Sequence, residues 1–371
     1  MMAMKNRFVF QWHINETCNL NCSHCYQSGP RRANIGDDEA REVIRQIHSF
    51  RPGYQNHSRK DLQDNRQIHV NLTGGEPFLH PHVFDYISRL KEQRNISTGI
   101  LSNGTIITAS IARQLKSAGV SFVQVSIDGC RSTHDQIRGE GSYVQAVEGL
   151  RILKNFNIPA HISFTATRSN YREYPEVAAL GRKTGAVKVW TDRVIPSANM
   201  DYPSESFIKK SHNEESPGEE SLNKEEVKKY IEIIAREQNK IKYKFVKTSP
   251  QSNRALQFLG GGLQIYHCGA AKNLLAILPG GDVYPCRRLP IKIGNVFESD
   301  LENIFQDNIY GNREKNNPYP EGCEKCFYVK LCQGGLKCLS FALTGNPDQG
   351  DPGCWMTSAH TGYSEVAPQA K

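Results

Sequence analysis

Apolar and polar residues along the first half of the chain follow a pattern that predicts six β-strands separated by helices. The expected strands are residues 7–14, 68–72, 97–101, 122–127, 160–166 and 187–191. Helical spacing of apolar residues recurs between them, at 37–49, 81–94, 108–118, 142–156 and 172–184. Because a repeated strand–helix unit favours a parallel sheet, we expect an α/β fold built on a partial (β/α)6 barrel of the TIM type.

The second half of the chain has fewer periodic segments. The polar run at 54–66 is expected to be an exposed insertion, and residues 201–221, rich in Ser, Glu, Lys and Pro, a linker. An amphipathic helix is expected at 223–240, whereas Gly, Pro and Cys dominate from about residue 262. We therefore expect a barrel at 1–200, a linker with one helix at 201–262, a small cysteine-rich domain at 263–356 and a tail at 357–371.

Charge and hydropathy exclude several classes of protein. The 46 Lys and Arg residues are interleaved with 38 Asp and Glu residues, so the net charge of +8 does not by itself indicate nucleic-acid binding. The N-terminal residues lack the apolar core of a secretion signal, and the chain has no apolar run long enough to span a membrane. We expect a cytoplasmic protein that binds neither nucleic acid nor membranes.

The eleven cysteines are grouped: three lie within residues 18–25, one is Cys130, and seven lie between residues 268 and 354. In a reducing compartment, thiols at short spacings are more plausible as metal ligands than as disulfides. Cys18, Cys22 and Cys25 form a C-x3-C-x2-C run directly after the first strand. Three thiolates on one loop can hold three irons of a cubane and leave the fourth iron open. A zinc site with His24 as its fourth ligand is the alternative.

The cysteine run resembles the motif of the radical S-adenosylmethionine (SAM) enzymes. The resemblance implies a [4Fe–4S] cluster whose open iron is chelated by the methionine end of SAM, which is cleaved to a 5′-deoxyadenosyl radical. Tyr26 matches the aromatic residue that contributes to the cofactor pocket in that family.

Further motifs follow the next strands, at the edge where barrel enzymes build their sites. Gly74-Gly75-Glu76 resembles the family's GGE motif, which implies that Glu76 receives the methionine amino group. Short polar residues after the third and fourth strands are expected to reach the ribose or the methionine end, and Asp128 is also the candidate catalytic residue. These positions are Ser102, Asn103, Ser126 and Asp128.

Two arginines and one cysteine complete the barrel candidates. Arg138 lies in a segment common in the family and is assigned to the cofactor site, where it would pair with a carboxylate; a surface ion pair is the alternative. Arg193, which follows the sixth strand, is likewise expected either to pair with a carboxylate at the site or to form a surface ion pair. Cys130 has no cysteine neighbour at ligand spacing, so a buried apolar role is expected.

The seven later cysteines exceed what one tetrahedral site requires. Their paired spacing is also typical of zinc ribbons. It resembles the SPASM domain, a C-terminal extension of radical SAM enzymes that holds two auxiliary [4Fe–4S] clusters. The resemblance assigns Cys323, Cys326, Cys332 and Cys354 to an outer cluster, and Cys268, Cys286 and Cys338 to an inner one.

The match to the SPASM domain departs from the family pattern in two places. The gap from Cys332 to Cys338 is longer than usual. No extra cysteine follows Cys268, so the inner cluster is expected to have an open iron, available to a substrate thiolate, or to take His267 or solvent as its fourth ligand.

These features predict an enzyme that uses SAM and three [4Fe–4S] clusters. We expect it to crosslink residues of a ribosomally made peptide or protein, through thioether or carbon–carbon bonds. The alternatives are an enzyme that forms formylglycine in sulfatases and, in a different class, a non-catalytic zinc or iron–sulfur protein.

The expected partners are a peptide or protein substrate and an electron donor such as flavodoxin or ferredoxin. Because little chain precedes Phe8, a leader peptide would be recognised by a separate leader-binding protein, by residues 54–66 or by residues 201–221.

Overall fold

The six expected strands form one continuous parallel sheet. The computed structural model describes residues 7–25, 34–51, 67–196, 220–240, 249–250, 255–261, 265–307 and 319–356. Each strand pairs with the next in parallel register, from β1 to β6. The bounds are β1 (Arg7–Asn15), β2 (Gln67–Gly74), β3 (Ile96–Ser102), β4 (Phe122–Ser126), β5 (Ala160–Ala166) and β6 (Lys188–Arg193).

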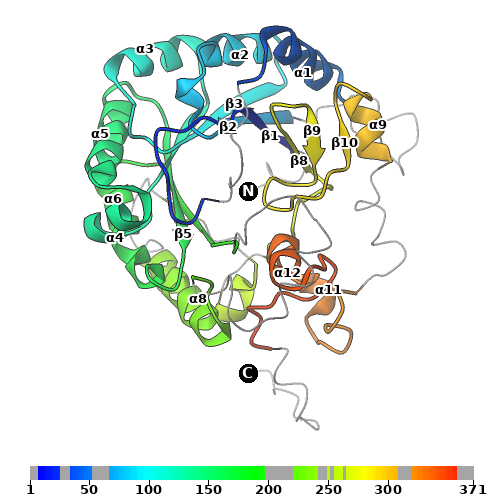
Figure 1. Ribbon diagram of the computed structural model, residues 1–371. Coiled ribbons are helices and arrows are strands. Elements are labelled where there is room, and N and C mark those ends of the chain that lie inside the picture. Colours follow the sequence, from blue (N-terminus) through cyan, green and yellow to red (C-terminus); the bar gives the residue numbers. More distant parts are fainter. Residues whose placement is uncertain are drawn as a thin grey trace.

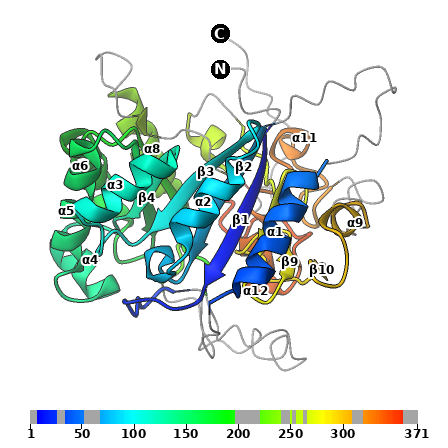
Figure 2. The same cartoon turned by 90° about the horizontal axis from the view of Figure 1, so that it is seen from above.

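The helices between these strands form an arc along the outer side of the sheet (Figures 1 and 2). They are α1 (Asp37–Ser49), α2 (Val83–Leu90), α3 (Ala109–Ala118), α4 (Arg131–Arg138), α5 (Ser142–Asn155) and α6 (Tyr174–Thr184), with a 3-10 turn at each of Pro77–Leu79 and Tyr171–Glu173. Of these, α4 was not predicted, because its eight mostly polar residues carry no apolar stripe. The α/β class and the partial TIM-type barrel are confirmed.

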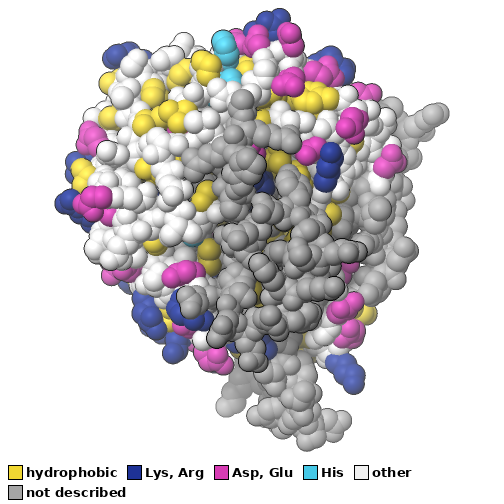
Figure 3. Space-filling model, in the orientation of Figure 1, with side chains coloured by type: hydrophobic (Ala, Val, Ile, Leu, Met, Phe, Trp, Pro, Cys, Tyr) yellow, Lys and Arg dark blue, Asp and Glu magenta, His cyan; other side chains and the backbone are white. Residues whose placement is uncertain are grey.

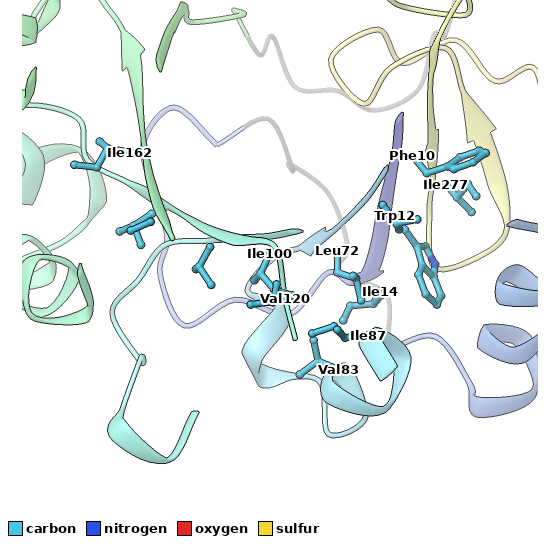
Figure 4. Packing of buried hydrophobic residues seen from close by; sticks show 14 of the residues in the cluster. Phe10, Trp12, Ile14, Leu72, Val83, Ile87, Ile100, Val120, Ile162 and Ile277 are labelled. Atoms are coloured by element: carbon cyan, nitrogen blue, oxygen red, sulfur yellow. The ribbon is translucent and has the colours of Figure 1, made fainter. Parts of the chain in front are cut away.

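Apolar side chains fill the space between the sheet and the helices. Ile14 and Leu72 project from β1 and β2 towards Val83 and Ile87 of α2, as Figure 4 shows, and none of the four exceeds 1% exposure. Apolar and polar residues alternate along these strands. In β2, for example, Ile68, Val70 and Leu72 are buried apolar residues, and the polar His69, Asn71 and Thr73 between them point to the opposite face of the sheet. Each buried apolar side chain contributes roughly 1.5–3 kcal/mol by leaving water.

The C-terminal part of the chain extends the barrel sheet. Strand β8 (Leu274–Ile277) pairs in parallel with β1, and β9 (Asp282–Tyr284) and β10 (Gly294–Asn295) continue the sheet antiparallel. At the other edge, β7 (Ser249–Pro250) pairs with β6. The sequence did not predict these strands because runs of two to four residues carry no measurable periodicity.

Short helices complete the C-terminal part of the chain that the structure describes. They are α9 (Leu301–Gln306), α11 (Val329–Cys332) and α12 (Lys337–Thr344), with a 3-10 turn at Gln257–Gly260. The helix expected at 223–240 is α8 (Lys224–Asn239), which begins with a capping box between Asn223 and Glu226. The insertion at 54–66, residues 201–219 of the linker and the tail at 357–371 lie outside the described residues.

Acidic and basic side chains alternate around the visible surface of the molecule (Figure 3). This agrees with the interleaved charges of the sequence. Within the described ranges, no helix combines the length and apolar character needed to cross a membrane.

Candidate active site

A pocket of about 330 Å³ opens at the carboxyl ends of the barrel strands. Its wall begins at the cysteine loop after β1 and passes along the ends of β2 to β6. It ends on the segment after Cys286, which belongs to the C-terminal part of the chain. We call this the barrel pocket; its polar lining includes Cys18, Cys22, Cys25, Ser102, Asn103, Ser126, Arg138, Asp192, Arg193, Arg287 and Arg288.

The three N-terminal thiols face this pocket on a loop that neighbouring elements fix. The backbone N–H of Ser23 donates to the carbonyl of Ile137, at 2.9 Å. Arg138 Nη1 lies 3.8 Å from Cys22 Sγ, and Asn103 Nδ2 lies 3.8 Å from Cys18 Sγ. Because donors directed at sulfur stabilise thiolate ligands, this set of residues fits an iron–sulfur cluster.

Burial opposes ionisation of these thiols. It raises the pKa of both Cys18 and Cys22. For Cys22, the guanidinium of Arg138 acts in the opposite direction. The guanidinium of Arg138 therefore favours the thiolate form of Cys22.

The two glycines after β2 allow that strand to touch the chain that leads into the cysteine loop. Gly75 N–H donates to the carbonyl of Asn15 at 3.0 Å, and Glu76 N–H donates to that of Thr17 at 2.8 Å. A Cβ at Gly75 would lie 2.2 Å from the Thr17 oxygen, and one at Gly74 would lie 2.2 Å from the Asn15 oxygen. The absence of a side chain at these two glycines thus lets the backbone of β2 approach closely, which positions the loop that begins at Cys18.

Glu76 links the same turn to the end of β3. Its fully buried carboxylate accepts hydrogen bonds from Ser102 Oγ at 2.9 Å and from the Asn103 N–H at 2.8 Å. Burial raises the pKa of Glu76 to about 7, although both hydrogen bonds act to lower it. The side chain lies just behind the described lining of the pocket.

Asp128 is also fully buried, at the end of β4. Its Oδ2 atom accepts a hydrogen bond from Arg138 Nε at 2.6 Å and lies 3.2 Å from Nε2 of His24. Its Oδ1 atom accepts one from the N–H of Thr165, at 2.7 Å. Burial alone would raise the pKa of Asp128, but Arg138 and His24 outweigh it and hold that pKa below its usual range.

Two of these contacts involve residues that the sequence singled out. Arg138 does pair with a carboxylate, and the pair is buried rather than exposed. His24 contacts Asp128, between two of the cysteines. Ser126 lines the pocket with its hydroxyl 3.4 Å from that of Ser163. Tyr26 lies outside the described residues.

The later cysteines lie in two places in the C-terminal part of the chain. Cys323, Cys326, Cys332 and Cys354 line one small cavity beside Tyr328. Burial raises the pKa of the Cys323 thiol to about 11 and that of Cys332 to about 12, and the neighbouring cysteines of the set act in the same direction.

Cys268, Cys286 and Cys338 pack together in a separate apolar cluster with Leu289 and Leu336. His267, which precedes the first of them, places Nε2 2.8 Å from the carbonyl of Leu331. Across the described ranges, no three Cys, His, Asp or Glu side chains converge closely enough for one metal ion. The four thiols beside Tyr328 instead share one cavity, and the other three share one cluster of packed residues.

Two ion pairs lie at the end of β6, and of their four residues the sequence singled out only Arg193. Asp192 pairs with Arg288, and Arg193 pairs with Asp351; each bond joins the barrel to a segment that carries cysteines. The available signals were the Arg-Arg pair directly after Cys286 and the adjacent opposite charges of Asp192 and Arg193. Cys130 differs from expectation, because it is only partly buried and its N–H donates to Glu173 at 2.7 Å.

Two family models match the chain. Residues 12–180 match the Radical SAM superfamily, and residues 268–327 match SPASM, described as an iron-sulfur cluster-binding domain. The first match covers the cysteine loop and most of the barrel, and the second covers the chain from Cys268 to Phe327.

Two relatives align along nearly the whole chain. An AdoMet-dependent heme synthase of Methanosarcina barkeri is 26% identical over 95% of this chain and 98% of its own length. The mycofactocin maturase MftC of Mycolicibacterium smegmatis is 27% identical over 92% of this chain and 81% of its own.

Solved structures support the fold. Native anSMEcpe with bound AdoMet superposes with a TM-score of 0.73 at 16% identity, covering 95% of both chains. Streptococcus suis SuiB bound to its precursor peptide SuiA gives a TM-score of 0.67 at 14% identity, covering 93% of this chain and 75% of SuiB.

Proposed function

Since this chain is a radical SAM enzyme that carries a C-terminal SPASM domain, we propose that it oxidatively modifies residues of a ribosomally made peptide or protein. The bond we propose is a crosslink, either a thioether or a carbon–carbon bond. The relative named as a maturase supports a peptide substrate, as does the similarity of fold to a protein solved with its precursor peptide.

One observation carries the proposal: a single pocket reaches from the N-terminal thiols to the segment that adjoins Cys286. A substrate in this pocket would lie between the residues that hold the radical source and those that hold an auxiliary cluster. An oxidative modification needs both, because removal of a hydrogen atom leaves an electron that must be accepted.

SAM and iron–sulfur clusters are cofactors of this enzyme. We assign three [4Fe–4S] clusters: one to Cys18, Cys22 and Cys25, and two to the inner and outer sets of the C-terminal part. When bound, the first cluster and SAM supply a 5′-deoxyadenosyl radical that can take hydrogen from carbon.

The residues of the pocket would orient these groups. Ser102, Asn103 and Ser126 present short polar side chains at the strand ends, suited to the ribose and methionine oxygens. Glu76, behind them, would accept a hydrogen bond from the methionine ammonium. We assign Asp128 to holding Arg138 and His24 in place, because its Oδ2 atom contacts both side chains, while its Oδ1 atom accepts from the Thr165 N–H.

The proposed partners beyond the substrate are an electron donor such as flavodoxin or ferredoxin and a separate leader-binding protein. The expected alternative of a non-catalytic zinc or iron–sulfur protein is wrong, because the superfamily and the named relatives are enzymes. Formation of formylglycine stays a proposal within the class.

A second candidate function is the modification of a tetrapyrrole. The alignment with a heme synthase favours it, because that alignment spans nearly all of both chains. A relative at 26% identity leaves the substrate open, so the two candidates require a direct test.

Reconstituted, reduced enzyme should be incubated with SAM and either a peptide encoded beside its gene or Fe-coproporphyrin III. We expect the peptide to lose two hydrogen atoms per crosslink by mass spectrometry, with matching formation of 5′-deoxyadenosine. Consumption of the tetrapyrrole with an unchanged peptide would contradict the proposal and favour the second candidate.

A further inference from the structure

Two consecutive residues at the end of β6 form ion pairs with two different C-terminal segments. Asp192 Oδ2 accepts a hydrogen bond from Arg288 Nη1 at 2.5 Å. Arg193 donates to both oxygens of Asp351, at 2.9 and 2.5 Å. The Arg193 and Asp351 side chains are 7% and 1% exposed, so this pair lies in the interior. Arg288 also donates to the carbonyl of Arg193, at 2.9 Å, which joins the two pairs.

The carboxylate of Asp351 fixes the turns that carry two of the cysteines. Its Oδ1 accepts from the N–H of Gly353 at 2.9 Å, and its Oδ2 accepts from that of Leu336 at 3.3 Å. Gly353 directly precedes Cys354 of the outer set, and Leu336 lies two residues before Cys338 of the inner set. A Cβ at Gly353 would lie 2.3 Å from Arg193 Nη1, so the fit depends on glycine.

The other ion pair lies beside the inner set. Arg288 belongs to the turn in which the Leu289 N–H donates to the Cys286 carbonyl at 2.9 Å, and Leu289 packs with Cys286 and Cys338. Burial raises the pKa of the Cys286 thiol to about 11 and raises that of Cys338 as well. Arg288 lowers the pKa of both thiols, whereas Asp192 raises it in both. One guanidinium and one carboxylate, bonded to each other, therefore act with opposite signs on the same two sulfurs.

We propose that the Asp192–Arg288 pair sets the reduction potential of the inner auxiliary cluster, while the Arg193–Asp351 pair ties the turns before Cys338 and Cys354 to the end of β6. The inference rests on the proposed assignment of that cluster to Cys268, Cys286 and Cys338. All four side chains are positioning residues in this account. The reduced state of a cluster carries one more negative charge, so a nearby guanidinium favours it and a nearby carboxylate opposes it.

The test is a redox titration of the reconstituted holoenzyme, followed by electron paramagnetic resonance. Arg288→Gln should shift the potential of one auxiliary cluster to a more negative value, and Asp192→Asn should shift it to a more positive value. The cluster that responds to added SAM should keep its potential in both variants. A merely structural role for the pair would not produce shifts of opposite sign.

Two further variants serve as controls. Arg288→Lys keeps the charge and should restore most of the wild-type potential. Arg182→Gln removes an ion pair with Glu237, 3.5 Å long, between α6 and α8 on the outside of the barrel, and should leave every potential unchanged. If Arg288→Gln loses iron, Arg288→Lys and Asp192→Asn are compared instead. The proposal then requires a potential close to that of the wild type in Arg288→Lys and a more positive potential in Asp192→Asn.

Shifts in the same direction, or no shift in iron-replete protein, would overturn the proposal. A shift in Arg288→Lys as large as that in Arg288→Gln would do the same, because charge would then not be the cause. Failure of the cluster assignment itself is distinguishable, because the wild-type enzyme would then lack the signal of the inner cluster.

Discussion

The barrel and the C-terminal part of this enzyme differ in how their structures are maintained. In the barrel, strands of five to nine residues pack against helices through an apolar core. Beyond residue 265, the described strands are two to four residues long, and α11 has only four. Such short elements bury little apolar surface, so ion pairs, tight turns and bound metal must provide more of the stability.

This difference shows that the two parts of the fold depend on different features of the sequence. The barrel is specified by hydrophobic periodicity, which is a property of neighbouring residues. The C-terminal part is specified by contacts over long sequence separations, such as Arg193 with Asp351. Removing iron should therefore affect the two parts very differently.

The largest expected effect is that of iron removal under anaerobic conditions. Amide hydrogen exchange in residues 319–356 should accelerate by roughly a hundredfold or more, because local opening there becomes nearly free of cost. The strands β2 to β5 should keep most of their protection, since their buried side chains pack mainly against those of the barrel helices. Equal loss of protection in both parts would mean that the barrel also depends on metal.

A core substitution in the barrel should have the next largest effect. Leu72→Ala removes a side chain with 0% exposure and should lower the free energy of unfolding by about 3 kcal/mol. Leu79→Ala is the matched control, because Leu79 is 38% exposed, and should change it by less than about 0.5 kcal/mol. Similar losses in the two variants, measured by denaturant titration, would show that this core does not dominate barrel stability.

Much of the barrel could be predicted from the sequence, and the reasons are local. The glycines, serines and acidic residues of the site follow strands that the apolar pattern already located, so their shared edge followed from the parallel sheet. Contacts between distant segments could not be predicted. That His24 would approach Asp128, and that Gly75 would approach Thr17, depends on loop conformations that have no periodic signal.

The C-terminal part was less predictable for a related reason. The resemblance to the SPASM domain implied two sets of cysteines; in the structure four of these thiols line one small cavity and the other three pack in a separate cluster. The pairing of β8 with β1 has no counterpart in the sequence, because four apolar residues fit a strand or a helix equally well.

Glu76 offers a smaller test, at the functional edge of the barrel. Glu76→Ala should weaken SAM binding about tenfold and leave the iron content intact, through loss of a charge-assisted hydrogen bond. Because the pKa of Glu76 is raised to about 7, SAM should also bind the wild-type enzyme more tightly at pH 8 than at pH 6. Glu92→Ala, on the surface, is the control. Unchanged affinity in Glu76→Ala, by calorimetry, would remove the assignment.

The smallest expected effect concerns a histidine inside the barrel. Burial, with Lys188 nearby, lowers the pKa of His161 to about 4, and its ring stacks on Phe122 at 4.1 Å. The unfolded chain takes up a proton near pH 6.5 while the folded one does not, so stability is lost as pH falls from 6.5 to 4. His161→Phe should reduce the decrease in the free energy of unfolding between pH 7.5 and pH 5 by about 1 kcal/mol. An unchanged acid sensitivity in urea unfolding would contradict this.

The central claim is that the barrel pocket binds a cluster and SAM at Cys18, Cys22 and Cys25. The most direct measurement is the formation of 5′-deoxyadenosine by anaerobically reconstituted, dithionite-reduced enzyme that contains about 12 iron atoms per chain. The wild-type enzyme should produce it, and Cys22→Ala should not, although it keeps the iron of the C-terminal part. A fully loaded wild-type enzyme that leaves SAM intact would contradict the account.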